Sequence, residues 1–294
     1  MDRMSSAARR SLSSSGRRAC VAALGLGLLG VGASRAQDPA ARRLAVGVET
    51  SLQLSGLAPR LGAALARDTG LAIDWRAGPS GLLLPQLERG ELDAAFTLAP
   101  ELEASLLRQN LIHDRRPVAE TALLLVGPAP RKATKKQPAQ PDPAGVAALE
   151  GGPDIARALA HIAAAGQRAE AVYVAASEPS GVRFLEQALW KAAGPQAVGA
   201  WLQANGGGPA ALLAQAAQAG GYALVERGVW AALGARHPGL AVLLGDDPRQ
   251  RATAHLMRPF RAHHPAARLA VAWLAGPGGR RAVAGFGRGY RAAG

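Results

Sequence analysis

Short apolar stretches alternate with amphipathic helical patterns along most of the chain, and this alternation restricts the possible folds more than any other feature. In the first half, apolar stretches of strand type lie at 44–48, 71–75 and 92–98, and each is followed by a helical pattern. Strand, loop and helix repeated in this order predict a parallel sheet with helices on both faces. The helical patterns of this half lie at 56–67, 82–89 and 100–109.

A second alternating set follows an extended stretch at 120–126 and a polar, lysine-bearing insert at 131–143 that is typical of an exposed loop. Two such sets, with a long return of the chain at the end, predict an α/β fold of two lobes connected by more than one crossing. The predicted segments are strands at 170–174, 222–225 and 240–244, an extended stretch at 254–257, and helices at 154–165, 196–203, 209–218, 265–275 and 278–286.

The first 36 residues have the pattern of a signal peptide. An arginine-bearing start is followed by the uncharged run 19–34, and the small residues Ser34 and Ala36 predict cleavage before Gln37 and export to the periplasm. The uncharged run is shorter than the roughly 20 residues of a membrane span. An uncleaved membrane anchor is the alternative, and either the general or the twin-arginine export route fits the segment.

The composition of the rest of the chain excludes several classes of protein. Cys20, the single cysteine, lies in the predicted signal peptide, so the mature chain has neither disulfides nor cysteine metal sites. The formal charge is +13; the first 36 residues hold six arginines and one aspartate, which leaves +8 for the remainder. The positive charge is spread along the chain, and the sequence has no arginine-rich stripe with interleaved aromatic residues. Nucleic acid is therefore not expected as a partner.

The histidines and serines show no pattern of a catalytic or metal site. No His-Glu-x-x-His or Gly-x-Ser-x-Gly motif is present, and Gly78-Pro79-Ser80-Gly81 is not a nucleophile elbow. We therefore expect no catalytic residue, no metal and no cofactor.

The stretch 175–194 joins a predicted strand to a predicted helix and is the clearest candidate for a binding loop. Ser177 or Ser180 can serve as the N-cap, and Gly181 follows in the first turn. The exposed N–H groups of such a helix start favour anions or polar head groups. An ordinary N-cap on an amphipathic helix is the alternative for this stretch.

Short motifs in a fixed order connect the chain from 44 to 286 with a known family. The chain resembles the tungstate-binding proteins of ABC importers, within the type 2 periplasmic solute-binding fold. The motifs that carry this resemblance are Thr50-Ser51 with Ser55-Gly56-Leu57, Asp114-Arg115-Arg116-Pro117-Val118, Val126-Gly127-Pro128, Ser180-Gly181, Ala188-Leu189-Trp190, Tyr222-Ala223-Leu224, Arg227-Gly228-Val229-Trp230 and Gly245-Asp246.

The resemblance implies two α/β lobes joined by hinge strands, with an oxyanion held between them by hydroxyl-rich loops at helix N-termini. Lobe one is then expected at 37–121 and 259–294 and lobe two at 122–258, with hinge strands at 120–126 and 254–259. The resemblance also implies an ABC permease in the membrane as the partner.

The chain departs from the family pattern in the ligand loops. Where the family has three threonines and a serine, the chain has Val48, Glu49, Thr50 and Ser51, and Ala176 replaces the arginine of the second lobe. Glu49 and Glu178 would repel a dianion. The expected ligand-binding residues are Thr50, Ser51, Ser80, Gly81, Ser177, Ser180 and Gly181, with Arg183 or Arg227 in place of the lost arginine.

The sequence therefore predicts a monomeric extracytoplasmic solute-binding protein of an ABC importer and not an enzyme. Its small-molecule ligand is expected to be a tungstate-like oxyanion or an altered solute, amine-bearing or neutral and polar, selected by the two carboxylates. The alternative is a sensory or interaction module that keeps the binding fold and has weak or no affinity for small ligands.

Overall fold

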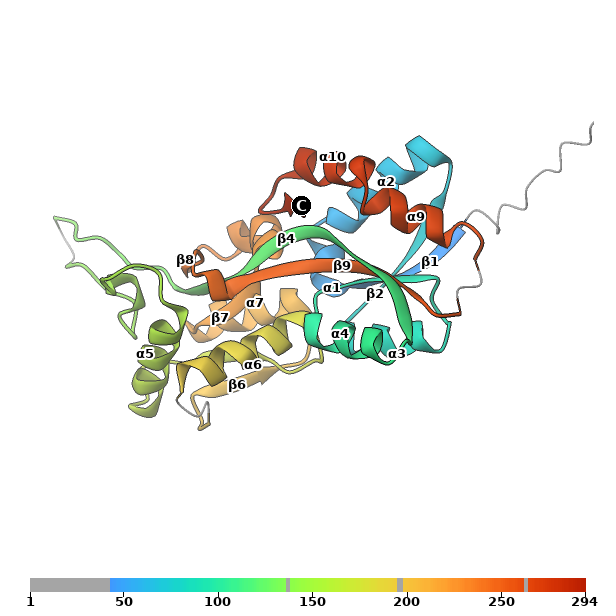
Figure 1. The fold of residues 1–294 in the computed structure, drawn as a ribbon. Coiled ribbons are helices and arrows are strands. Elements are labelled where there is room, and N and C mark those ends of the chain that lie inside the picture. The colour runs from blue at the N-terminus through green and yellow to red at the C-terminus, as the bar shows by residue number, and fades with distance from the viewer. Residues whose placement is uncertain (1–42, 136–137, 195–197, 262–263) are drawn as a thin grey trace, which may run out of the picture. The chain divides into compact units, whose positions relative to one another are not determined.

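The computed structural model describes residues 43–135, 138–194, 198–261 and 264–294 and shows a mixed α/β fold (Figure 1). The predicted signal peptide lies outside the described residues. Of the helices in the described ranges, none is long and apolar enough to cross a membrane. The fold class agrees with the alternation of strand and helix patterns in the sequence.

Six strands, here called the first strand group, lie in the order β2-β1-β3-β9-β4-β10. β1 runs parallel to β2 and β3, whereas β9 pairs antiparallel with β3 and β4 although it comes from the far end of the chain. The strands are β1 (Arg43–Glu49), β2 (Ala72–Gly78), β3 (Ala94–Thr97), β4 (Ile112–Pro128), β9 (Arg251–Pro259) and β10 (Arg291–Ala292).

β4 is the longest strand and takes part in two sets of pairings. Its residues up to Ala122 pair with β9, and from Leu123 onward it pairs antiparallel with β7 (Ala223–Glu226) and β8 (Leu240–Leu244). Figure 1 shows β4 in green running beside β9 and continuing toward β7 and β8. The extended stretch predicted from the sequence is thus part of a strand that belongs to both halves of the fold.

The second strand group consists of β7, β8 and the parallel pair β5 (Tyr173–Ala176) and β6 (Leu202–Asn205). A single bridge between Tyr173 and Tyr222 links β5 to the residue before β7. The Tyr222 hydroxyl donates to Asp142 Oδ2 over 2.7 Å, and Asp142 also accepts from the N–H groups of Val146 and Ala147. The buried Asp142 thereby fixes the end of the 131–143 insert on this group.

Helices cover both faces of each strand group. The helices are α1 (Thr50–Leu54), α2 (Leu57–Thr69), α3 (Ser80–Glu88), α4 (Pro100–Arg108), α5 (Ile155–Gln167), α6 (Gly181–Ala193), α7 (Gly208–Ala219), α8 (Arg227–Leu233), α9 (Ala267–Leu274) and α10 (Pro277–Phe286), with short 3-10 turns η2 (Val146–Ala148), η3 (Gly234–Arg236) and η4 (Pro248–Gln250).

The apolar side chains form separate cores on the two faces of each group. In β4, Leu123 and Leu125 pack in one core with α5, whereas Leu124 and Val126 pack in another with α7. This is the period of two expected for a strand buried on both faces, and it explains the unbroken apolar run of the sequence. In the first group, α2, α9 and α10 cover one face and α3 covers the other.

The helix predicted at 196–203 is wrong at its C-terminal end. Residues 195–197 lie outside the described residues, and Leu202–Asn205 form β6. Trp201 is buried in the second group, where a side chain on Gly166 would come within 2.5 Å of its ring. The strand forms because it pairs in register with β5, a tertiary contact that overrides local helical spacing.

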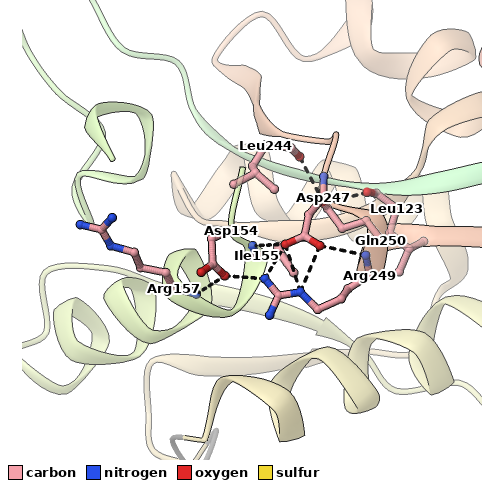
Figure 2. A network of polar contacts seen from close by, with 8 residues as sticks. All are labelled: Leu123, Asp154, Ile155, Arg157, Leu244, Asp247, Arg249 and Gln250. Atoms are coloured by element: carbon pink, nitrogen blue, oxygen red, sulfur yellow. Dashed lines mark hydrogen bonds and ion pairs between the residues drawn. The ribbon is translucent and has the colours of Figure 1, made fainter. Parts of the chain in front are cut away.

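A polar network fixes the chain between β8 and β9 (Figure 2). The buried Asp247 accepts from the Ile155 N–H at the start of α5 over 2.8 Å and is paired with Arg249. The Gln250 amide donates to the carbonyl oxygens of Leu123 over 2.8 Å and Leu244 over 3.3 Å. The Arg249 guanidinium, with the N–H groups of Ile155 and Arg249, holds the pKa of Asp247 at about 2. The start of β9 is thus tied to α5, β4 and β8 at once.

Candidate functional site

Glu49 is the last residue of β1, and its side chain is fully buried where the two halves of the fold meet. Its Oε2 accepts hydrogen bonds from the Ser80 N–H over 2.9 Å and from the Gly181 N–H over 3.1 Å, and also from the Ser80 hydroxyl. The first donor begins α3 and the second begins α6. One carboxylate oxygen therefore joins two helix N-termini that lie about a hundred residues apart in the sequence.

The local sequence explains why these donors converge. Ser80 follows Pro79 in extended conformation and opens α3, so its N–H has no partner inside the helix. Ser180 caps α6 by accepting from the Arg183 N–H over 3.3 Å, which leaves the Gly181 N–H free to point outward. Both helix starts carry partial positive charge, so the arrangement is an anion-binding cradle.

Glycine is required at two positions of this cradle. A Cβ on Gly181 would lie 2.5 Å from Leu98 Cβ, and one on Gly81 would lie 2.8 Å from both Cβ and O of Pro179. The Gly81 N–H donates to the Pro179 carbonyl over 2.8 Å. The loop before α3 and the loop before α6 are thus in direct backbone contact beside the Glu49 carboxylate.

Two polar atoms near these donors are buried without a hydrogen-bond partner in the described part of the chain. They are Glu49 Oε1 and Ser51 Oγ, both on fully buried residues. Burial raises the pKa of Glu49 to about 7, although the bonds from Ser80 and Gly181 oppose this and the nearby Glu178 adds to it. The cradle therefore holds a carboxyl group that can lose or gain a proton near neutral pH.

The space next to the cradle is small. A cavity of about 10 Å³ is lined by Glu178, Ser180 and Glu226, among others. This volume admits at most a single water molecule. Burial also raises the pKa of Glu178, a second carboxyl of this region, above its ordinary value.

The structure brings together five of the nine predicted ligand-binding residues around Glu49. Ser80 and Gly181 donate to Glu49 directly, and Gly81, Ser180 and Ser51 adjoin these contacts.

Thr50 and Ser177 contribute no side-chain hydrogen bond within the described residues, and Thr50 begins α1. The Arg183 guanidinium donates to the Ser177 carbonyl and so binds its own loop. In this conformation Arg183 does not contact the Glu49 carboxylate.

Arg227 lies outside this cluster. Its guanidinium donates to the Gly245 carbonyl over 2.7 Å and borders a separate cavity of about 410 Å³. Sequence reasoning placed it with the other candidates because the family motif around it matches. Arg227 directly follows Glu226, the last residue of β7, and lines this cavity together with residues of β4, β9 and β10.

Sequence reasoning missed the role of Glu49. Its substitution for a hydroxyl residue indicated repulsion of a dianion, whereas in the structure its carboxylate takes the helix N–H donors itself. The signal was present in the position: a carboxylate at the end of a buried parallel strand points to the edge where the next helices begin.

Comparison with known proteins gives the family. The model of the bacterial extracellular solute-binding proteins matches residues 49–288, which is most of the chain and includes every residue of the cradle. The chain belongs to this family. It is a solute-binding protein.

Two solved structures of tungstate proteins are similar to this solute-binding protein. The structure titled as the tungstate ABC transporter from Geobacter sulfurreducens is 25% identical, with a TM-score of 0.69 over 83% of this chain and 98% of the other. The tungstate-binding protein from Desulfovibrio alaskensis G20 is also 25% identical, with a TM-score of 0.68 over 85% and 98%. The chain therefore has the two-lobed α/β fold of periplasmic binding proteins.

A curated relative from Haloferax volcanii, whose name assigns it to the anion-binding proteins of ABC transporters, is 28% identical over 203 residues. The match covers 69% of this solute-binding protein and 54% of the relative. The chain thus spans about half the length of that protein.

Proposed function

We propose that this solute-binding protein is exported, loses its signal peptide near Ala36, and delivers a small solute to an ABC permease as a periplasmic monomer. The family and the relatives that handle tungstate or anions support this, and binding rather than catalysis accords with the family. The boundaries of the two lobes, with residues 37–121 and 259–294 in one and 122–258 in the other, form part of the same proposal.

We further propose that the solute is not a dianionic oxyanion bound with high affinity. The observation that carries this is the Glu49 carboxylate on the N–H donors of Ser80 and Gly181. An oxyanion that used the same donors would have to displace Glu49 and lie against Glu178 as well. An amine-bearing or neutral polar solute admitted when these loops separate would instead find acceptors in Glu49 Oε1 and Glu178.

The missing donors add to this effect. A lost charge-assisted partner costs about 1.5–3 kcal/mol and each lost hydroxyl about 1 kcal/mol, so tungstate affinity should be about a thousandfold lower than with a complete site. Ala176 stands where the family has its arginine, and it lies next to the small cavity at the cradle.

A titration of the mature protein tests the proposal. We expect no stabilisation of the wild type by micromolar tungstate, and a gain in tungstate affinity for the double variant Glu49→Thr, Ala176→Arg. Glu150→Gln, which removes one carboxylate from an exposed loop, is the matched control. Micromolar or tighter tungstate binding by the wild type, or no gain in the double variant, would contradict the proposal.

The same thermal-shift assay should include a diamine, a zwitterionic amino acid and a neutral sugar. A ligand at a hundred times its Kd stabilises the protein by about 2.7 kcal/mol, which such an assay detects. If none of these solutes and no oxyanion stabilises the wild type, the second candidate is favoured. That candidate is a sensory or interaction module whose cradle is permanently occupied by Glu49.

A further inference from the structure

A cavity of about 410 Å³ lies where β4, β9 and β10 meet, and none of the Glu49 cradle residues lines it. Three arginines line it: Arg227 from α8, Arg251 from β9 and Arg291 from β10. The volume is within the range of sites for small organic molecules. Neither the family match nor the relatives assign a role to it.

The pairing register places four polar residues of this cavity, Glu120, Arg251, Thr253 and Arg291, on one face of the sheet. Glu120 of β4 lies opposite Arg291 of β10 and opposite Thr253 of β9. Two residues along, Ala122 lies opposite Arg251. Residues that are opposite one another, or two apart on one strand, share a face of a sheet, so both arginines and Thr253 point to the same side.

Arg227 is held in place by two other segments of the chain, around Gly245 and around Gly289. Its guanidinium donates to the Gly245 carbonyl, and a Cβ on Gly245 would lie 3.5 Å from the guanidinium and 2.5 Å from Leu124. A Cβ on Gly289 would lie 2.5 Å from Arg227 Cγ, so the C-terminal segment packs directly on the arginine stem. The two glycines thus let the backbone pack closely around Arg227, which fixes its side chain before any ligand binds.

The charges around the cavity leave two guanidinium groups free. Within the described residues, Arg251 and Arg291 form no hydrogen bond or ion pair through their side chains. The acids that line the cavity are Glu120, Asp246 and Asp247. Asp247 is paired with Arg249, and the Asp246 side chain is 86% exposed with only a 3.5 Å contact to Arg227. Glu120 alone opposes Arg251 and Arg291 on the sheet face.

We propose that this cavity is a second binding site, for a small organic or inorganic anion that carries at least two carboxylate or phosphate groups. A guanidinium offers a planar pair of donors that matches such oxygens, and three arginines line this cavity together with Thr253. Glu120 would disfavour a single negative charge placed next to it, so the anionic groups belong near Arg227, Arg251 and Arg291.

The site would also connect the two halves of the fold. Thr121 and Tyr290 line the cavity, and the hydroxyl of each donates to the buried Glu226. The Glu226 carboxylate also accepts from the Gly228 N–H and so holds the start of α8. Burial raises the pKa of Glu226. An anion bound here would touch strands of the first group and the helix α8 of the second.

Calorimetric titration of the mature protein with pyrophosphate and with citrate, at low ionic strength, tests the site. We expect at least one of the two to bind, and the double variant Arg251→Gln, Arg291→Gln to weaken that binding about a hundredfold, about tenfold for each lost guanidinium. The control Arg268→Gln, Arg281→Gln removes the same charge from exposed positions of α9 and α10 and should leave the affinity within about twofold.

Two further arms separate this site from others. The Glu49→Thr, Ala176→Arg variant should bind pyrophosphate or citrate as the wild type does, because the cradle lies elsewhere. Arg227→Lys, which keeps the charge and loses the planar donor pair, should weaken binding about tenfold. No binding of either probe by the wild type, or equal weakening in the cavity variant and the control, would overturn the proposal while leaving the proposed function of the cradle untouched.

Discussion

Glu49 is fully buried, and one of its carboxylate oxygens accepts three hydrogen bonds. Its other oxygen accepts none within the described residues. Burial outweighs the donors and raises its pKa to about 7. Glu186 resembles it: buried, bonded by the Tyr173 hydroxyl and the Ala176 N–H, and with its pKa raised to about 7 by burial. Two carboxyls near the start of α6 therefore titrate close to neutral pH.

We predict that Glu49 makes the protein less stable as the pH rises from about 4.5 to 7. The folded state binds the proton more tightly than the unfolded chain, whose glutamate has a pKa of 4.5. The stabilisation is complete below 4.5 and is lost as the pH passes through 7, a change of about 3 kcal/mol for a shift of this size. Urea unfolding of wild type and Glu49→Gln across this range measures it.

The difference between the two proteins is the informative quantity, because Glu186 and Glu226 add slopes of the same sign to both. Glu49→Gln should be less dependent on pH by about 3 kcal/mol over the window. Parallel stability curves for the two proteins would show that the Glu49 carboxyl titrates as it does in water.

At the scale of single residues, the sequence indicated the loops that carry the N–H donors but not that the Glu49 carboxylate binds these donors. Ser180 and Gly181 were predicted from a helix-start pattern, which is local and hence visible in the sequence, whereas Ser80 was expected from the family resemblance. The bond from Gly181 to Glu49 spans 132 residues, and no local pattern specifies it. The position of Arg227 apart from this cluster was not predictable for the same reason, since its partner Gly245 is brought near only by the folded strands.

Among the elements, the long alternating segments were predictable and the short ones were not. The apolar run of β4 and the amphipathic pattern of α5 reflect burial on two faces and on one face, respectively. β6 has four residues and depends on its parallel neighbour β5, so the helical spacing around Trp201 was misleading.

At this scale we predict that Gly181→Ala destabilises the protein by about 1–3 kcal/mol, since the new methyl group overpacks a rigid contact. The atoms it meets include the Leu98 carbonyl at 2.7 Å, which belongs to the backbone and cannot rotate away. Gly239→Ala is the matched control, because a Cβ there meets nothing within 4 Å. Chemical denaturation of both variants gives the comparison, and equal midpoints would refute the predicted contact between the α6 start and Leu98.

For the whole molecule, the two-lobed fold was predictable because many short motifs occur in order, each weak alone. The lobe boundaries stay predictions. β4 belongs to both strand groups, and the return through η4 into β9 is held by the Asp247 network (Figure 2).

We predict that the exported protein begins at or within a few residues of Gln37, with a formal charge of +8 instead of +13. The physical reason is the order of charged start, uncharged run and small residues at the cleavage position. Intact-mass spectrometry of the periplasmic fraction measures it. A mature form that retains Met1 and stays with the membrane would contradict the prediction.

The position of β9 between β3 and β4 has a consequence for how the protein is made. A chain that has emerged only as far as residue 250 holds β1, β3 and β4 but lacks β9, the strand that joins β3 to β4. Pairings across such a large separation in sequence form slowly, because the chain loses the entropy of closing the loop before any contact stabilises the pairing. The order of the strands thus postpones the pairings that complete the first group until synthesis is almost finished.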